Sequence, residues 1–318
     1  MIEVSHLTKR YAAHTAVEDL SFTVPDGGVY GLLGPNGAGK TTTMNIMTGC
    51  LAATSGTVSI GGYDIFEDER EAKRRLGYLP ELPPLYMDST PAEYLDFVAR
   101  AKGLAGDELK RSVRRVLAET HTDDVANRLM RNLSKGYRQR VGIAQALLGS
   151  PEAVILDEPT VGLDPRQIIE IRDLIHELGE QRTVILSSHI LSEVQAVCGT
   201  VLIISRGRLV ACDTPENLEK VLAGGHTLEI TAEAAPEDVS GILAQVSGIE
   251  RADLTALENG FTHGSLTTAE GSGVERELFF AFARANIALT ELHAARASLE
   301  EVFLELTASD PAEGGGRE

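Results

Sequence analysis

The sequence predicts an α/β fold over residues 1–225, followed by a smaller α+β domain over residues 226–308. In the first part, short apolar runs typical of buried strands alternate with helical patterns, as in a parallel sheet covered by helices. One glycine-rich loop joins a predicted strand at 29–33 to a helix at 41–47. Beyond a pair of glycines at 224–225 the composition changes, which indicates a domain boundary.

Two further buried strands are expected at 153–156 and 183–186, where apolar residues dominate. Between them, Asp164 can cap a helix whose first position is Pro165. Apolar residues at helical spacing predict the buried face of this helix, and Gly179 is expected to end it. That face consists of Ile168, Ile171, Ile175 and Leu178.

Residues of about 85–150 are more purely helical in pattern, which predicts a helical subdomain inserted between the glycine-rich loop and the later strands. In the carboxy-terminal domain, Ser298 and Glu301 form a capping box for a closing helix. The tail over 309–318 is rich in glycine, and we expect it to be disordered. The other elements expected in this domain are strands at 227–232 and near Phe261 and helices at 239–246 and 274–285.

The charge of the chain argues against one class of partner. The formal net charge is −18, and residues 226–318, with 17 acidic and 5 basic side chains, carry −12 of it. A surface this acidic repels phosphate backbones, so nucleic acid is not expected as a partner. No apolar run reaches the roughly 18 residues of a membrane-spanning helix, and the amino terminus lacks a signal-peptide pattern. The isolated cysteines suit a reducing cytoplasm; they are Cys50, Cys198 and Cys212.

The loop at 34–42 has the pattern of a phosphate-binding loop, with glycines, then a lysine and a hydroxyl. Glycines let the backbone wrap closely around a polyphosphate, and the N–H groups at the start of the next helix point at it. Lys40 can reach the β- and γ-phosphates, and the Thr41 hydroxyl suits Mg²⁺. We therefore expect a nucleoside triphosphate to bind. The loop consists of Gly34, Pro35, Asn36, Gly37, Ala38, Gly39, Lys40, Thr41 and Thr42.

Two adjacent carboxylates follow the predicted strand at 153–156. Asp157, at the strand end, can hold the water shell of Mg²⁺ opposite Lys40. Glu158 projects in a different direction and can orient or deprotonate an attacking water. Acidic loops after core strands are common, but the phosphate loop upstream favours the catalytic interpretation of this pair.

A third pattern, Asn132–Arg140, precedes a helical run and contains Leu-Ser-Lys-Gly-Tyr. It resembles the signature motif of the ATP-binding cassette (ABC) ATPases, whose usual core is Leu-Ser-Gly-Gly-Gln. Ser134 and Gly136 stand at a helix start, where a hydroxyl and free N–H groups can meet a γ-phosphate presented by another molecule. Lys135 and Tyr137 stand in place of one of the two glycines and of the glutamine of that core.

The resemblance extends over residues 1 to about 225 and implies further roles. Tyr11 matches the aromatic residue that stacks on adenine, and Asp164 lies in the segment that communicates across the dimer. His189 matches the switch histidine, whose imidazole can hold the attacking water against Glu158. Where the family usually has a glutamine, this chain has Glu81, which we expect to bind Mg²⁺ more directly and to change metal preference without abolishing turnover.

The resemblance also implies partners and a location. Two subunits, as a homodimer or as a heterodimer with a related ATPase, would close on ATP and Mg²⁺. Each ATP would lie between the 34–42 loop and the partner's 134–137 segment. A separate transmembrane permease subunit would dock near 81–86, placing the chain at the cytoplasmic face of the cell membrane. The carboxy-terminal domain resembles the extension of some bacterial ABC exporter ATPases, which favours export of an unspecified cargo.

Other functions are less consistent with the sequence. A soluble ABC ATPase of translation or repair would bring two cassettes or a long coiled coil. A regulator without turnover would be expected to lose Glu158 or His189. Another phosphate-loop enzyme, such as a small-molecule kinase, does not explain the signature segment. The alternative that stays open is a soluble or regulatory ABC ATPase that acts as a nucleotide-gated interaction module. The role of residues 226–308 is open as well.

Overall fold

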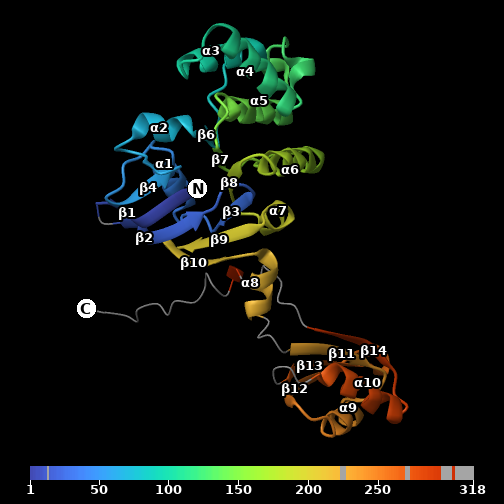
Figure 1. Ribbon diagram of the computed structural model, residues 1–318. Helices are drawn as coiled ribbons and strands as arrows, with labels where there is room; N and C mark the ends of the chain where they lie inside the picture. The colour runs from blue at the N-terminus through green and yellow to red at the C-terminus, as the bar shows by residue number, and fades with distance from the viewer. Residues whose placement is uncertain (13, 223–226, 269–272, 295–302, 305–318) are drawn as a thin grey trace, which may run out of the picture. The chain divides into compact units, whose positions relative to one another are not determined.

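The computed structural model describes residues 1–12, 14–222, 227–268, 273–294 and 303–304. The chain divides into two compact units at the start of helix α8 (Pro215–Leu222), before the glycine pair at 224–225 that was expected to mark the boundary (Figure 1). The described residues Phe303 and Leu304 belong to the first unit, although the second domain was expected to extend to residue 308. The expected tail at 309–318 and the capping box at 298–301 lie outside the described residues.

The first unit is built on a six-stranded sheet in the order β10-β9-β3-β8-β7-β6. Its strands are parallel except for the edge strand β10, which pairs antiparallel with β9. Every residue of β7 and β8 is buried, as expected for central strands covered on both faces. The strands are β3 (Val29–Leu33), β6 (Leu76–Leu79), β7 (Ala153–Leu156), β8 (Thr183–Ser188), β9 (Thr200–Ser205) and β10 (Arg208–Asp213).

A second, antiparallel sheet in the order β2-β1-β4-β5 belongs to the same unit. One apolar core joins the two sheets and helix α1, because Val4 and Leu20 pack in the same cluster as Met44, Leu32 and Ile155. The elements are β1 (Ile2–Tyr11), β2 (His14–Val24), α1 (Lys40–Met47), β4 (Ser55–Ile60), β5 (Tyr63–Asp64) and α2 (Glu69–Arg74).

The helical region consists of α3 (Pro91–Ala101), α4 (Gly106–Glu119) and α5 (Lys135–Leu147), with 3₁₀ turns at Asp123–Val125 and Met130–Asn132. Helix α3 begins with a capping box, in which Thr90 and Glu93 exchange side-chain and backbone hydrogen bonds. Helix α4 buries the apolar stripe Leu109, Val113, Val116 and Leu117. Its other basic residues are exposed, but Arg115 is partly buried and donates to the carbonyl oxygen of Leu147 at 3.0 Å.

Helices α6 (Pro165–Gly179) and α7 (Leu191–Val197) follow the carboxyl ends of β7 and β8. Asp164 caps α6, since its Oδ1 accepts a hydrogen bond from Gln167 N at 2.9 Å. The predicted buried face was wrong at Ile168, which is only partly buried, whereas Leu174 is 1% exposed. Within the described ranges, no helix is both long enough and apolar enough to cross a membrane.

The second unit contains β11 (Thr227–Ala232), α9 (Pro236–Leu243), β12 (Ile249–Ala256), β13 (Thr262–Thr268), α10 (Val274–Arg284) and β14 (Leu289–Ala294). The antiparallel order β12-β13-β11-β14 is the split β-α-β arrangement of ferredoxin-like folds. One face of the sheet packs on the helices through residues such as Ile230, Leu266 and Phe282. The predicted fold class, α/β followed by α+β, is confirmed.

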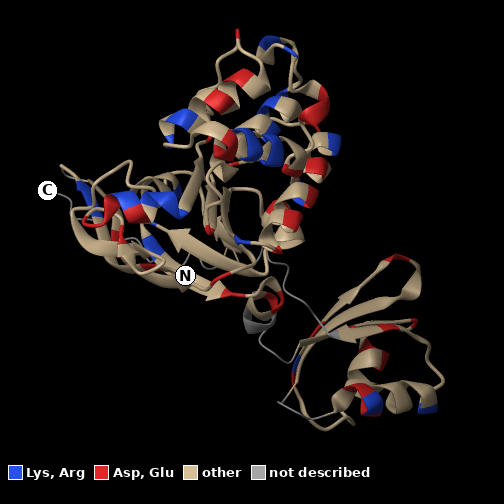
Figure 2. Ribbon diagram, turned by 45° about the horizontal axis from the view of Figure 1, so that its top comes forward, with Lys and Arg blue, Asp and Glu red and all other residues tan. Residues whose placement is uncertain are grey.

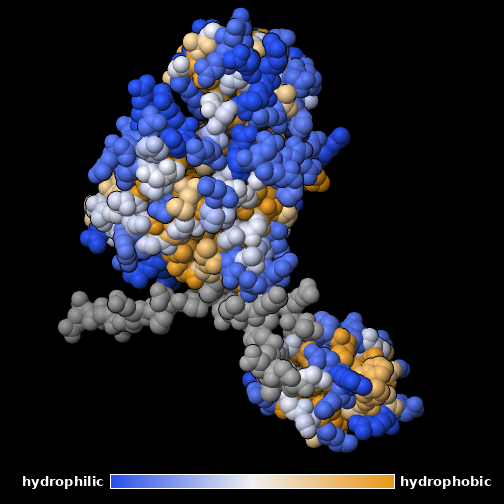
Figure 3. All heavy atoms as spheres, in the orientation of Figure 1, coloured by the Kyte–Doolittle hydropathy of each residue, from blue (hydrophilic) through white to orange (hydrophobic). Residues whose placement is uncertain are grey.

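The surface of the second unit is sparsely basic, with Arg251, Arg276 and Arg284 as its basic side chains between residues 227 and 294 (Figure 2). Figure 3 shows hydrophobic atoms, in orange, on the surface of this unit. Its exposed apolar side chains include Phe279, 57% exposed, and Phe280, 50% exposed.

Candidate active site

A cavity of about 520 Å³ collects most of the predicted site residues from distant parts of the first unit. Its wall includes Tyr11 at the end of β1, residues 36–42 of the phosphate loop and α1, Glu81 after β6, Glu158 after β7, and His189 after β8. The volume lies within the range of small-molecule sites. Sequence reasoning did not identify His14, Ala16 and Val161, which also line the cavity.

The phosphate loop owes its shape to two glycines with left-handed backbones. Gly37 has φ +81° and its missing side chain would point into open space. Gly39 has φ +104°, and a Cβ there would lie 2.5 Å from the carbonyl oxygen of Ala16. The first N–H groups of α1 have no partners within the helix, so they are available to an anion. An open turn with free N–H groups fits a polyphosphate.

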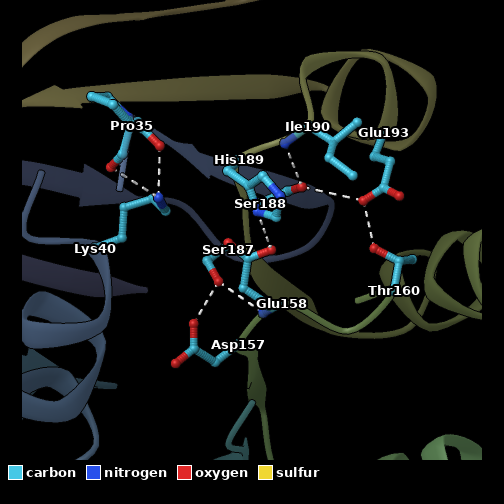
Figure 4. A network of polar contacts seen from close by, with 11 residues as sticks. Pro35, Lys40, Asp157, Glu158, Thr160, Ser187, Ser188, His189, Ile190 and Glu193 are labelled. Atoms are coloured by element: carbon cyan, nitrogen blue, oxygen red, sulfur yellow. Dashed lines mark hydrogen bonds and ion pairs between the residues drawn. The ribbon is translucent and has the colours of Figure 1, made fainter. Parts of the chain in front are cut away.

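Lys40 is held inside this loop. It is 6% exposed, and its Nζ donates to the carbonyl oxygens of Gly34 at 2.6 Å and Pro35 at 3.3 Å (Figure 4). Burial lowers the pKa of Lys40, while Glu158 and Asp157 act in the opposite direction. Because an ammonium has three N–H donors, one remains for a phosphate oxygen.

The two carboxylates after β7 differ in environment. Asp157 is 2% exposed, and its Oδ1 accepts a hydrogen bond from Ser187 Oγ at 2.6 Å. Burial raises the pKa of Asp157, the Ser187 hydrogen bond lowers it, and the nearby Glu158 and Glu81 raise it further. A buried carboxylate whose pKa is shifted by burial and by neighbouring charges, at the edge of a cavity, is a candidate ligand for a cation.

Glu158 points toward His189 instead. Its Oε2 lies 2.9 Å from His189 Nδ1, and the Glu158 side chain is 11% exposed against 44% for His189 (Figure 4). Glu158 has φ +47°, an uncommon left-handed conformation for a residue with a Cβ. Its backbone N–H donates to Ser187 Oγ at 2.8 Å, so the same serine holds both carboxylate residues.

The residues predicted to hold Mg²⁺ provide hard oxygen donors but no closed cage. Thr41 and Glu81 line the cavity, and Asp157 lies behind it. Over the residues described, no cluster of three or more His, Cys, Asp or Glu side chains could hold a metal ion alone. Mg²⁺ in phosphate sites usually keeps several waters and is shared between one or two carboxylates and substrate phosphates.

The signature segment lies elsewhere on the first unit. Ser134, Gly136, Tyr137 and Asp164 line a separate hollow of about 220 Å³. Ser134 caps α5 by accepting a hydrogen bond from Tyr137 N at 3.3 Å. Lys135 Nζ donates to the carbonyl oxygen of Val161 at 2.7 Å. The two atypical residues therefore make contacts within their own chain, since Tyr137 Oη also donates to Asp124 at 2.9 Å.

Sequence reasoning missed a polar layer beneath the site, formed by Thr160, Ser187, Ser188 and Glu193 (Figure 4). The serines carried a weak signal, because two hydroxyls end an otherwise apolar strand. Glu193 carried none, because an acid in the first turn of a helix is ordinary.

Comparison with known proteins agrees with this geometry. The family model described as "ABC transporter" matches residues 17–161. The chain is 31% identical over 308 residues to the linearmycin resistance ATP-binding protein LnrL of Bacillus subtilis (strain 168), covering 96% of this chain and 98% of LnrL. It is 41% identical over 212 residues to the bacitracin transport ATP-binding protein BcrA of Bacillus licheniformis, covering 66% and 68%.

Solved structures give the same result. A structure described as the ATP binding subunit of an ABC transporter superposes with a TM-score of 0.62 at 33% identity, covering 70% of this chain and 93% of that one. CbiO1 from Clostridium perfringens superposes with a TM-score of 0.63 at 27% identity, with the same coverage. Since its match to LnrL runs the length of both proteins, the chain belongs to the ABC transporter family, as an ATP-binding and ATP-hydrolysing subunit.

Proposed function

We propose that this chain powers an exporter, as the Mg²⁺-dependent ATPase subunit that works on a separate transmembrane permease. The observation that carries the proposal is the contact between Glu158 and His189, 2.9 Å apart, at a cavity walled by the phosphate loop. A carboxylate and an imidazole in contact beside a phosphate site form the arrangement needed to activate water.

Each predicted residue has a part in this mechanism. The phosphate loop, with the N–H groups at the start of α1 and the remaining Lys40 donor, holds the phosphates, and Tyr11, 45% exposed, offers a ring for the adenine. Thr41, Asp157 and Glu81 would hold Mg²⁺, which would supply positive charge to neutralise the phosphates. Glu158 accepts a proton from the attacking water, and His189 orients Glu158 and meets the γ-phosphate.

A second subunit completes the site. The hollow that contains Ser134, Gly136 and Tyr137 shares no residue with the phosphate-loop cavity, which supports a role for this segment toward a nucleotide held by another molecule. We infer a homodimer, or a heterodimer with a related ATPase, with Asp164 beside the contact. Closure on ATP and opening after hydrolysis would then do mechanical work.

The permease and the direction of transport are inferred from surface chemistry and from relatives. Leu82 is 84% exposed, and Tyr86 and Phe97 are about half exposed with ring centroids 5.6 Å apart. An apolar patch of this kind fits a protein partner, which would hold the chain at the cytoplasmic face of the membrane. The names of LnrL and BcrA refer to linearmycin resistance and bacitracin transport, which favours a drug-type exporter.

The test is ATP hydrolysis by the purified chain, with and without Mg²⁺, as a function of protein concentration. Specific activity should rise with concentration, because the site needs two subunits. Glu158→Gln should lower turnover by roughly 10²–10⁴-fold, the usual contribution of a general base, and should still bind ATP. Binding without turnover in the unmodified chain would instead support a nucleotide-gated regulator.

A further inference from the structure

Beneath the site, a buried carboxylate joins the two segments that carry Glu158 and His189. Glu193, on α7, is 5% exposed and lines neither the phosphate-loop cavity nor the signature hollow. Its Oε2 accepts hydrogen bonds from Thr160 Oγ1 at 2.5 Å and from Ser188 Oγ at 3.2 Å (Figure 4). Burying a carboxylate is unfavourable unless hydrogen bonds compensate it, and these two hydroxyls provide them.

Both hydroxyls come from residues that lie close in sequence to Glu158 or His189. Ser188 directly precedes His189, and its Oγ also accepts a hydrogen bond from Ile190 N at 2.9 Å. The Ser188 side chain is thus attached to the backbone on both sides of His189. Thr160 follows Glu158 by two residues, in a turn where Val161 N donates to the Glu158 carbonyl at 3.2 Å.

The strained backbone of Glu158 needs such support. A non-glycine residue at φ +47° persists only where its surroundings over-determine it. Ser187 holds the N–H of Glu158 from one side, and the bond from Thr160 to Glu193 holds the following turn from the other.

We propose that Glu193 is a positioning residue for hydrolysis, which sets the distance between Glu158 and His189 by tying their two segments to one oxygen atom. This inference rests on the proposed role of the pair in activating water. Since a displacement of about 1 Å in a reacting group can lower a rate 10²-fold, loss of the carboxylate should act on turnover more than on nucleotide binding.

The experiment compares the full-length chain with Glu193→Ala, Glu193→Gln, Thr160→Val and Val194→Ala. Val194 is the matched control, because it is fully buried on the same helix but outside the hydrogen-bond network. Glu193→Ala should lower kcat about 10- to 100-fold with KM for ATP changed less than about threefold. Glu193→Gln keeps an acceptor oxygen, so its kcat should be much closer to that of the unmodified chain. The kcat of Thr160→Val should lie between those of Glu193→Ala and the unmodified chain.

A second readout does not depend on turnover. The ring resonances of His189, followed by NMR in histidine-labelled protein, should move in Glu193→Ala in the direction seen for Glu158→Gln and stay in place in Val194→Ala. Unmoved resonances, or an equal loss of kcat in Val194→Ala, would overturn the positioning role. An inactive unmodified chain would count against the proposed function alone, since the resonances still decide the role of Glu193. Should Glu193→Ala not fold, Glu193→Gln and Thr160→Val carry both readouts.

Discussion

The glycines of the phosphate loop allow a paired test of what holds the site in shape. Gly37 and Gly39 both have positive φ, but only at Gly39 would a Cβ approach backbone, 2.5 Å from the Ala16 carbonyl oxygen. Gly37→Ala should therefore introduce only the left-handed strain, about 1–2 kcal/mol. Gly39→Ala should add an overpacking term of about 1–3 kcal/mol, because β2 cannot move aside as a flexible side chain could.

Together, strain and overpacking should lower the free energy of unfolding by about 2–5 kcal/mol in Gly39→Ala. At roughly 2–4 °C per kcal/mol for a unit of this size, Tm should fall about 2–8 °C in Gly37→Ala and about 4–20 °C in Gly39→Ala. The assay is calorimetry of the full-length chain, in which the transition that ATP shifts belongs to the first unit. Equal destabilisation by the two substitutions would refute the argument, since the contact with Ala16 is what separates them.

Two further predictions concern the carboxylates. Glu81→Gln removes an exposed negative charge from the cavity, so the Mg²⁺ concentration for half-maximal hydrolysis should rise by no more than about tenfold. Turnover at saturating Mg²⁺ should be retained. If metal dependence and turnover were both unchanged, Glu81 would have no metal-binding role. Asp157 has a pKa raised by burial, so its ionised form destabilises the folded protein at neutral pH. Without nucleotide or metal, Asp157→Asn should therefore raise Tm at pH 7, and the gain should shrink as pH falls through the raised pKa and vanish below the ordinary 3.8. A gain independent of pH, measured by thermal unfolding across that range, would contradict this assignment.

Local chemistry made much of this structure predictable. Strand β7 is wholly apolar and strand β8 has an apolar run at 184–186, and every residue of both strands is buried, so their pattern is clear. Strand β12 was missed because it is an edge strand with mostly exposed residues, which erases the alternation of apolar and polar positions. Strand β14 was missed too. Its partner strand is β11, and the two are separated in the chain by a helix, two strands and another helix, so no local pattern indicates their pairing.

In the site, too, local features were predictable and contacts between distant segments were not. The phosphate loop consists of a continuous run of residues, so its pattern can be identified from the sequence. The support for Glu158 comes from Thr160, Ser188 and Glu193, whose relation depends on the pairing of β7 with β8. No spacing along the chain encodes that pairing. Ile168 was expected to be buried and is not fully so. Helical spacing alone does not tell how far the buried face of α6 extends toward its first turn.

The bond from Lys135 to Val161 has a consequence for chimeric proteins. Val161 receives the ammonium on its carbonyl oxygen and donates its own N–H to Glu158, at 2.7 and 3.2 Å. A graft that imports Leu-Ser-Gly-Gly-Gln would delete the ammonium and, with it, the hydrogen bond from the signature helix to the turn that follows Glu158. In this protein the segments around residues 135 and 161 are therefore one transplantable module, and a functional exchange between relatives would have to move both together.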